Sequence, residues 1–309
     1  MPTGPTSSVL FLPGIDPIQA WELGQFYTLN GFDLWEEHRT IPGAIHLFDM
    51  ISICANGVVC TVPNGFAVSR ILVAGGMGLD ATGKQRSLVQ STVTGQDWVD
   101  LACDGVVPCP HGRARRFFVL QGEIYVVARA FKTSPPSRPF VWHYLYATNE
   151  LIEVSATPML PSGDFMMHDN FPFASGIIYL SGKTDGTSHF AGGSLMYATS
   201  ITSAAAVTLP VVGVVPRSLR IIGGQVYLLS DKNEGGNVYT VYLHKSPALT
   251  GSDWTEVCRF QTLPAGGIAR SFEHVPSIGI NGGAGRLYFG IGTPYLLVDG
   301  MFDLRTLSN

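Results

Sequence analysis

The sequence predicts an all-β fold made of a repeated four-stranded unit, and three observations support this. A glycine is followed three residues later by a tyrosine four times, at Gly122–Tyr125, Gly176–Tyr179, Gly224–Tyr227 and Gly285–Tyr288. These tyrosines lie 54, 48 and 61 residues apart, the spacing expected of one propeller blade. Short runs of β-branched and aromatic residues lie between them, and no segment keeps a helical period. We therefore expect a single-domain β-propeller.

Each repeat is expected to hold four strands bounded by Gly, Pro, Asn and Asp. In the unit marked by Gly122 they are 116–120, 124–127, 141–146 and 151–154. In the next two units they are 170–174, 177–180, 194–198 and 206–209, then 218–222, 226–229, 238–244 and 254–259. In the last unit they are 272–280, 287–289, 295–298 and 302–307.

A degenerate copy precedes these units, from Phe48 to Cys103, and two or three further strands are expected between Val9 and Glu37. Five units and a partial one predict six blades, with five as the alternative, and terminal strands that share the closing blade. The expected boundaries are 1–47 for the partial N-terminal blade and then 48–110, 111–165, 166–215, 216–268 and 269–309.

Composition narrows the classes of function. The chain is 46% hydrophobic and only 14% charged, against a usual charged fraction of about 25%, which favours a surface partly covered by partners. A net charge of −4 gives no basic field that would recruit nucleic acid. We see no secretory signal and no apolar run long enough to span a membrane. The five cysteines include two C-x5-C spacings, which zinc sites do not use, so we expect buried free thiols in a reducing compartment.

Two turns end in tryptophan and share the sequence Thr-Gly-x-Asp-Trp. They place Gly95 before Trp98 and Gly251 before Trp254. A glycine turn followed by an aromatic side chain is expected to pack between blades. These glycines and tryptophans, like the glycine–tyrosine pairs, are therefore interpreted as structural.

The first of these turns resembles the Asp-box (BNR) repeat of sialidase-like propellers, Ser-x-Asp-x-Gly-x-Thr-Trp. Ser91, Gly95 and Trp98 match in register, whereas Val93 replaces the aspartate and Asp97 the threonine. In the second turn only the glycine and the tryptophan match. The resemblance implies a propeller whose boxes lie on the face opposite the active site.

Resemblance to sialidases further implies three arginines that clamp a carboxylate, a Tyr–Glu nucleophile pair and an aspartate acid/base. Arg217 and Arg270, each followed by serine, begin innermost strands. The equivalent place in another unit is occupied by Arg113, Arg115 and Arg116. No partner set accompanies them, so we interpret these arginines as a recurrent feature that lines the channel mouth or bonds loop carbonyls.

One face is expected to carry long polar links between second and third strands, and elaborated loops on a rigid scaffold are the usual place for recognition. These links are 80–86, 132–138, 183–193 and 231–237. The candidate binding residues are Asp80, Lys132, Lys183, Asp185 and Asp231 in the loops, with Arg113, Arg116, Arg217 and Arg270 at the channel mouth.

No phosphate-loop, metal-ligand or nucleophile motif is present, and His168-Asp169 is interpreted as a polar contact in a loop. We therefore predict no catalytic residue, metal or cofactor. The main hypothesis is a non-enzymatic interaction propeller that binds other protein subunits or copies of itself. It resembles bacteriophage tail, hub and appendage propellers, which implies a virion component made in the host cytoplasm. The alternative is a sialidase-like propeller that binds or hydrolyses a surface glycan.

Overall fold

The structure is a computed structural model, and every regular element that it describes is a strand. The described residues are 8–10, 25–29, 35–40, 44–59, 68–79, 85–93, 97–107, 109, 113–129, 140–154, 165–183, 192–235, 238–248, 253–261, 268–275 and 286–292. None of the described segments forms a helix of the length and apolarity needed to cross a membrane.

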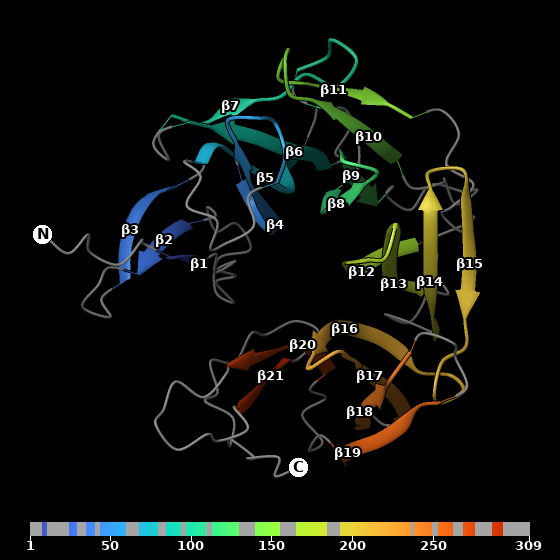
Figure 1. Ribbon diagram of the computed structural model, residues 1–309. Helices are drawn as coiled ribbons and strands as arrows, with labels where there is room; N and C mark the ends of the chain where they lie inside the picture. The colour runs from blue at the N-terminus through green and yellow to red at the C-terminus, as the bar shows by residue number, and fades with distance from the viewer. Residues whose placement is uncertain are drawn as a thin grey trace, which may run out of the picture. The chain divides into compact units, whose positions relative to one another are not determined.

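The described residues form six antiparallel sheets whose strands follow one another in chain order (Figure 1). Two sheets are smaller: β1 (Ser8–Leu10), β2 (Gln25–Leu29) and β3 (Trp35–Thr40) form one, and β20 (Ile268–Val275) and β21 (Arg286–Gly292) form the other. The remaining four are four-stranded. They consist of β4 (Ala44–Cys54), β5 (Val68–Leu79), β6 (Gln85–Thr92) and β7 (Val99–Asp100); β8 (Arg113–Leu120), β9 (Glu123–Arg129), β10 (Phe140–Leu145) and β11 (Glu150–Glu153); β12 (Phe165–Phe173), β13 (Gly176–Lys183), β14 (Gly192–Ser200) and β15 (Ser203–Val207); and β16 (Val215–Ile222), β17 (Gln225–Gly235), β18 (Val238–Ser246) and β19 (Thr255–Gln261).

The four-stranded repeat is confirmed, and each strand of the sheets β8–β11, β12–β15 and β16–β19 overlaps the segment predicted for it. The predicted strands 295–298 and 302–307 lie outside the described residues, and the shared closing blade stays a prediction. One predicted loop is wrong, because β17 continues to Gly235 and turns most of the expected link 231–237 into strand.

Contacts divide the chain into two compact units, Met1–Asp164 and Phe165–Asn309. In the first unit one apolar core joins the two four-stranded sheets and includes Ile53, Leu72, Phe117 and Trp142. In the second unit neighbouring residues of β17 enter different cores: Leu228 packs with Leu180, Leu195 and Leu219, whereas Leu229 packs with Val241 and Phe272. Successive strand residues point to opposite faces, so this sheet is apolar on both.

The glycine–tyrosine pairs do not all occupy the same structural position. Gly122 and Gly224, with φ of 85° and 77°, lie in two-residue turns, as predicted. Gly176 instead begins β13, after a turn at 174–175, and a side chain there would collide with the carbonyl of Ala198. The tyrosine that follows is therefore shifted by one residue relative to the other copies.

That shift reverses the face to which the tyrosine points. The first strand of each of these sheets contains a β-bulge, an extra unpaired residue. Tyr125 and Tyr227 each pair with the third residue after the bulge, Phe118 and Arg220. Tyr179 pairs with Asn170, the second residue after the bulge. Tyr179 is consequently fully buried, and burial raises the pKa of its hydroxyl. Aligning the repeats on the tyrosines alone misplaces this sheet by one residue.

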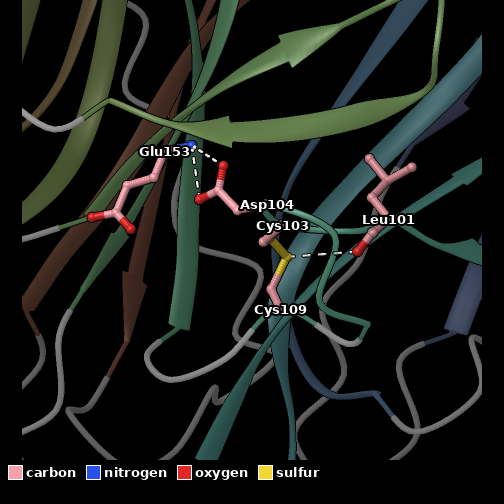
Figure 2. Close-up of a disulfide and its surroundings, with 5 residues drawn as sticks. All are labelled: Leu101, Cys103, Asp104, Cys109 and Glu153. Carbon is pink, nitrogen blue, oxygen red and sulfur yellow. Dashed lines mark hydrogen bonds between the residues drawn. A yellow bond between two sulfur atoms is a disulfide. The ribbon is translucent and has the colours of Figure 1, made fainter.

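The link between β7 and β8 is joined to the following sheet. Leu151 of β11 donates its N–H to Ala102 and accepts one from Asp104, so residues 102–104 extend this sheet by a short parallel bridge. The carboxylate of Asp104 also accepts the N–H of Glu153 (Figure 2). The link therefore covers part of an edge that would otherwise expose its backbone groups.

The prediction of free thiols is wrong for Cys54, Cys103 and Cys109, although all three are buried as expected. Cys103 and Cys109, which are 2% and 1% exposed, form a disulfide across this link (Figure 2), and Cys54 is disulfide-bonded as well. Cys258 is a free thiol. An odd cysteine count leaves at least one thiol free in the chain but does not prevent the other four from pairing. The C-x5-C spacing of Cys103 and Cys109 brings their Cα atoms to 5.0 Å. Disulfides are typical of oxidising environments, so the cysteines no longer support the expected reducing compartment.

The tryptophan at the second turn confirms its predicted packing role. The indole Nε1 of Trp254 donates to the carbonyl of Thr208 at 3.1 Å, and the ring packs against the core between the sheets β12–β15 and β16–β19. Trp98 is half-buried just before β7. The glycines of both turns, Gly95 and Gly251, lie outside the described residues, as does Gly285.

Candidate functional site

The first strand of each sheet from β4 onward contains a β-bulge close to its N-terminal end. The register shifts by one residue between Leu47 and Asp49, and at the corresponding points of β8, β12, β16 and β20. The extra residues are Phe48, Arg115, His168, Arg217 and Arg270. Bulges of this kind commonly redirect a side chain next to a functional site.

The bulges give an alignment of the predicted arginines that the sequence alone did not. Arg217 and Arg270 are both bulge residues, and their equivalent in β8 is Arg115. Arg116 is the next residue along and pairs with Val127, while Arg113 pairs with Arg129 at the start of the strand. The recurrent arginine predicted from the sequence is therefore present, but Arg115 rather than Arg113 or Arg116 is its copy in β8.

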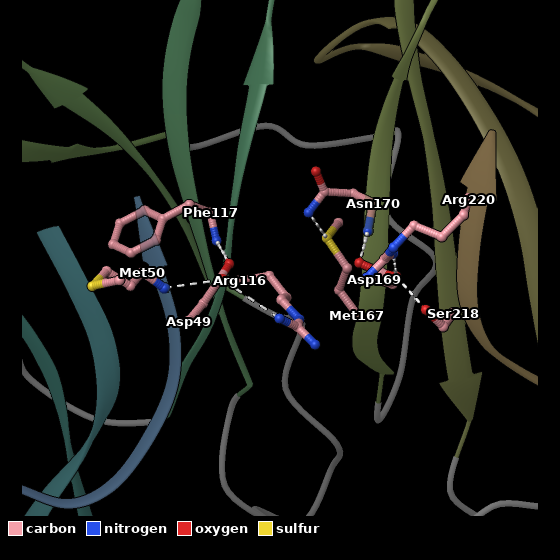
Figure 3. Close-up of polar contacts among 9 residues, drawn as sticks. All are labelled: Asp49, Met50, Arg116, Phe117, Met167, Asp169, Asn170, Ser218 and Arg220. Carbon is pink, nitrogen blue, oxygen red and sulfur yellow. Dashed lines mark hydrogen bonds and ion pairs between the residues drawn. The ribbon is translucent and has the colours of Figure 1, made fainter. Parts of the chain in front are cut away.

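The residue after the bulge forms a link from one sheet to the next in both units (Figure 3). In the first unit, Asp49 of β4 accepts the N–H of Phe117 in β8 at 2.7 Å. In the second unit, Asp169 of β12 accepts the N–H of Leu219 in β16 at 3.3 Å. In both, the other carboxylate oxygen accepts the N–H of the residue that follows, at 3.0 Å. We call this arrangement the aspartate link.

An arginine of the following sheet completes each aspartate link. The guanidinium of Arg116 lies 3.4 Å from the carboxylate of Asp49. Arg220 donates to Asp169 at 2.9 Å, and the hydroxyl of Ser218 donates to the same oxygen at 3.0 Å. Hydrogen bonds to ionised groups are stronger than neutral ones, so these contacts hold the first strands of adjacent sheets at a fixed spacing.

The second unit has one further link between sheets, which is formed by two predicted site residues. Arg217 donates through Nε and Nη2 to the two carboxylate oxygens of Asp231, at 2.9 and 3.0 Å. The side chains are 4% and 0% exposed. Asp231 also accepts the N–H of Ala269 in β20 at 3.0 Å. The fork of Arg217 is thus engaged by a carboxylate of the chain itself, in the geometry that a ligand carboxylate would need.

The other predicted binding residues are not brought together in the described part of the chain. Lys183 ends β13, opposite Phe165 and Gly192, rather than beginning a loop. Arg270 is placed by its backbone alone, in β20. Asp80, Lys132 and Asp185 lie outside the described residues. Among the described residues, no three His, Cys, Asp or Glu side chains lie close enough together to hold a metal ion.

Comparison with solved structures concerns the fold. The structure of YjhT has a TM-score of 0.51 and 12% identity, over 94% of this chain and 92% of that one. Together with this similarity, the successive four-stranded antiparallel sheets of this chain decide the architecture. The fold is a β-propeller.

Two further similar structures of the propeller class score lower. Virginiamycin B lyase from Staphylococcus aureus has a TM-score of 0.44 and 11% identity, over 86% of this chain and 70% of that one. An exo-β-1,3-galactanase from Clostridium thermocellum has a TM-score of 0.44 and 12% identity, over 79% and 57%. Neither resembles this propeller closely enough to transfer an activity. No known protein family and no curated protein sequence matches the chain, and the Asp-box and virion resemblances gain no support.

A pocket of about 220 Å³ lies in the first unit, on the side of the short turns. Gly57 and Gly122 border it, and Tyr144 and Tyr146 form part of its wall. Arg70 donates to the hydroxyl of Tyr144 and lies 4.9 Å from the ring centre of Tyr146. Burial raises the pKa of the Tyr144 hydroxyl, an effect that the Arg70 hydrogen bond partly offsets. These contacts fix the tyrosines between two sheets and use their polar atoms for structure.

Sequence reasoning missed the aspartates of the links. Asp49 and Asp169 each follow a large side chain, in Leu-Phe-Asp and Met-His-Asp, and precede a strand continuation. An alignment on this apolar–bulky–Asp pattern, rather than on the tyrosines, indicates the common position. His168-Asp169 is consequently not a loop contact as predicted: it is the bulge and the linking aspartate of β12.

Proposed function

We propose that this propeller is a non-catalytic interaction protein that works as a subunit of a larger assembly. The observation that carries the proposal is the way in which the inner strands use their charged groups. The aspartates of β4, β12 and β17 and the arginines that bind them all hold the chain's own sheets together, as the Arg217–Asp231 pair does. Charged groups engaged in this way support a rigid scaffold rather than a site that must bind and release a substrate.

Low charge supports the same proposal. Only 14% of residues are charged, which suits a protein whose surface is partly covered in its working state. A virion is one assembly in which to test this.

The mass of the protein in solution tests this proposal. We expect light scattering of material isolated from the native source to give either a stoichiometric complex with another protein or a homo-oligomer. A strict monomer that carries no stoichiometric protein partner would falsify it.

A glycan-binding or glycoside-hydrolysing propeller is the second candidate. One observation favours it: the bulge residue is basic in four of the five bulged first strands, as Arg115, His168, Arg217 and Arg270. Guanidinium groups suit the carboxylate of an acidic sugar. Arg115 is half-buried, which leaves part of its surface for such a contact.

A panel of fluorogenic glycosides that includes a sialoside separates the two candidates. The interaction proposal expects no hydrolysis above the buffer rate. The glycan candidate expects turnover or saturable sugar binding that Arg115→Gln abolishes, while Arg259→Gln, a matched change of an arginine that is two-thirds exposed, leaves it unchanged. Thermal unfolding of each variant controls for loss of fold.

A further inference from the structure

Exposed apolar side chains gather at the outer edges of the two four-stranded sheets in the first unit. Five of the eight exposed large hydrophobic residues in the described part of the chain belong to the segments 93–107 and 150–153. They are Val93 (70% exposed), Val99 (56%), Val106 (51%), Val107 (57%) and Ile152 (40%). We call this set the valine edge. Gathered exposed apolar groups of this kind mark interaction sites more often than scattered ones do.

Backbone and side-chain contacts hold the parts of the valine edge together. Val99 pairs with Ser91 at the edge of its sheet, and Asn149, in the turn before β11, donates to the hydroxyl of Ser91 at 3.0 Å. Val106 pairs with Cys103, which in turn bridges to Leu151, the neighbour of Ile152. The edge thus runs from β7 across the disulfide-closed link to β11.

The disulfide gives the centre of this surface a defined shape. Asp104 and Gly105, with φ of 49° and 78°, form the tight turn that presents Val106, and the Cys103–Cys109 bond closes the loop around both exposed valines. A preformed loop loses little conformational entropy when it binds. Exposing two adjacent valines to water forgoes the free energy that burying them against a partner would provide.

Carboxylates border the valine edge. The segments 93–107 and 140–154 contain no lysine or arginine. Their acidic residues are Asp97, Asp100, Asp104, Glu150 and Glu153, each of them exposed or half-buried. A second copy docking through the same surface would bring these carboxylates against one another, which is unfavourable. Charge complementarity therefore favours a partner whose apolar residues are flanked by lysine or arginine.

We propose that the valine edge is the docking surface for a basic, aliphatic-rich segment of another protein. This inference rests on the proposed interaction function and names the chemistry of its partner. Val106 and Val107 supply the apolar centre, and Glu150 and Glu153 supply part of the acidic border. The disulfide-closed link between β7 and β8 positions the two valines, and its Asp104 carboxylate accepts the N–H of Glu153.

The test uses the full chain and a fluorescein-labelled synthetic peptide that alternates lysine with valine or leucine. Its controls are the same peptide with glutamate for lysine and the same peptide with serine for each aliphatic residue. Fluorescence anisotropy is expected to show saturable binding of the first peptide alone. Binding of either control with comparable affinity, or no binding of the first peptide, overturns the inference.

Matched variants locate the contact. Val106→Ser/Val107→Ser is expected to weaken peptide binding by about tenfold or more, whereas Val212→Ser, at a valine 92% exposed in the second unit, leaves it unchanged. Glu150→Gln/Glu153→Gln is expected to weaken binding and to reduce its salt dependence, and Glu234→Gln is the charge control. Equal binding by wild type and the Val106/Val107 variant overturns the inference.

The failure of this inference and that of the proposed function give different results. A native complex that keeps its stoichiometric partner when Val106 and Val107 are replaced by serine overturns the valine edge and leaves the interaction function standing. Absence of any stoichiometric protein partner or homo-oligomer overturns the interaction function itself. Loss of the native partner in the Val106→Ser/Val107→Ser variant, with unchanged thermal unfolding, supports both.

Discussion

Arg217 and Asp231 form a two-point ion pair whose side chains are 4% and 0% exposed, and the same carboxylate accepts the N–H of Ala269. Removing one partner leaves a buried charge without compensation. We therefore expect Asp231→Ala to lower the free energy of unfolding by about 3–5 kcal/mol. Urea denaturation followed by tryptophan fluorescence measures the change.

Removing both charges should be less harmful than removing one, because no isolated charge then stays in the interior. We expect Arg217→Met/Asp231→Leu to be more stable than Asp231→Ala. A double variant as unstable as the single one would contradict the pairing.

The aspartate link predicts a local effect on one amide. Asp169→Ala removes the acceptor of the Leu219 N–H, and an unsatisfied buried group costs about 1–3 kcal/mol. Hydrogen exchange at the Leu219 amide is expected to accelerate. Asp169→Asn keeps an acceptor and should show a smaller effect, and Glu234→Gln serves as a surface control. Unchanged exchange at Leu219 in Asp169→Ala argues against the link.

Removal of the Cys103–Cys109 disulfide is expected to destabilise the link between β7 and β8. Cys103→Ser/Cys109→Ser is expected to lower the free energy of unfolding by about 2–3 kcal/mol, because the short closed loop no longer restricts the unfolded chain. Cys258→Ser, which removes a free thiol, is the matched control. Limited proteolysis should cut the double variant between β7 and β8 first; equal protease resistance in wild type and variant speaks against a restraining role.

His244 predicts a loss of stability on acidification. Burial lowers the pKa of its imidazole, an effect that the nearby Glu256 partly opposes, and Nδ1 has no hydrogen-bond partner among the described residues. The unfolded chain then binds more protons than the folded one as pH falls below the ordinary histidine value of about 6.5. The stability associated with neutral His244 is therefore present above that pH and is lost as pH falls toward the folded pKa.

The variant His244→Leu tests this sign. It should flatten the part of the stability–pH curve that lies below about pH 6.5, as measured by urea midpoints over that range. Because the imidazole is 4% exposed and Nδ1 makes no compensating bond in the described part, we expect only a small cost at neutral pH. A variant whose pH dependence equals that of wild type removes His244 as a contributor.

The sequence was informative about strands because their signal is local. Alternating apolar residues and glycine turns, as at Gly122 and Gly224, placed the strands of three sheets to within a few residues. The shifted tyrosine of β13 escaped this reasoning because Gly176 is required by a contact with Ala198 on a neighbouring strand. Nothing in the local sequence separates that role from a turn.

The candidate site was less predictable because its groups are distant in the chain. Asp49 and Phe117 are separated by 68 residues, so no motif contains both. The arginines were recognised as recurrent, but a bulge moves Arg115 rather than Arg116 into register. Asp231 was expected in a loop because a lysine, an asparagine and glycines follow it. It lies instead within β17, where its carboxylate pairs with Arg217.

The link between β7 and β8, which forms a hairpin at 103–106, is synthesised before the strand that it contacts. Residues 101–107 leave the ribosome before Leu151, the residue to which they bond, and at typical elongation rates the delay is about 2–10 s. Cys103 and Cys109 are only six residues apart, so an oxidising compartment can join them within that interval. Where oxidation is that fast, the residues that will cover the edge of β11 acquire their shape before β11 itself has been made.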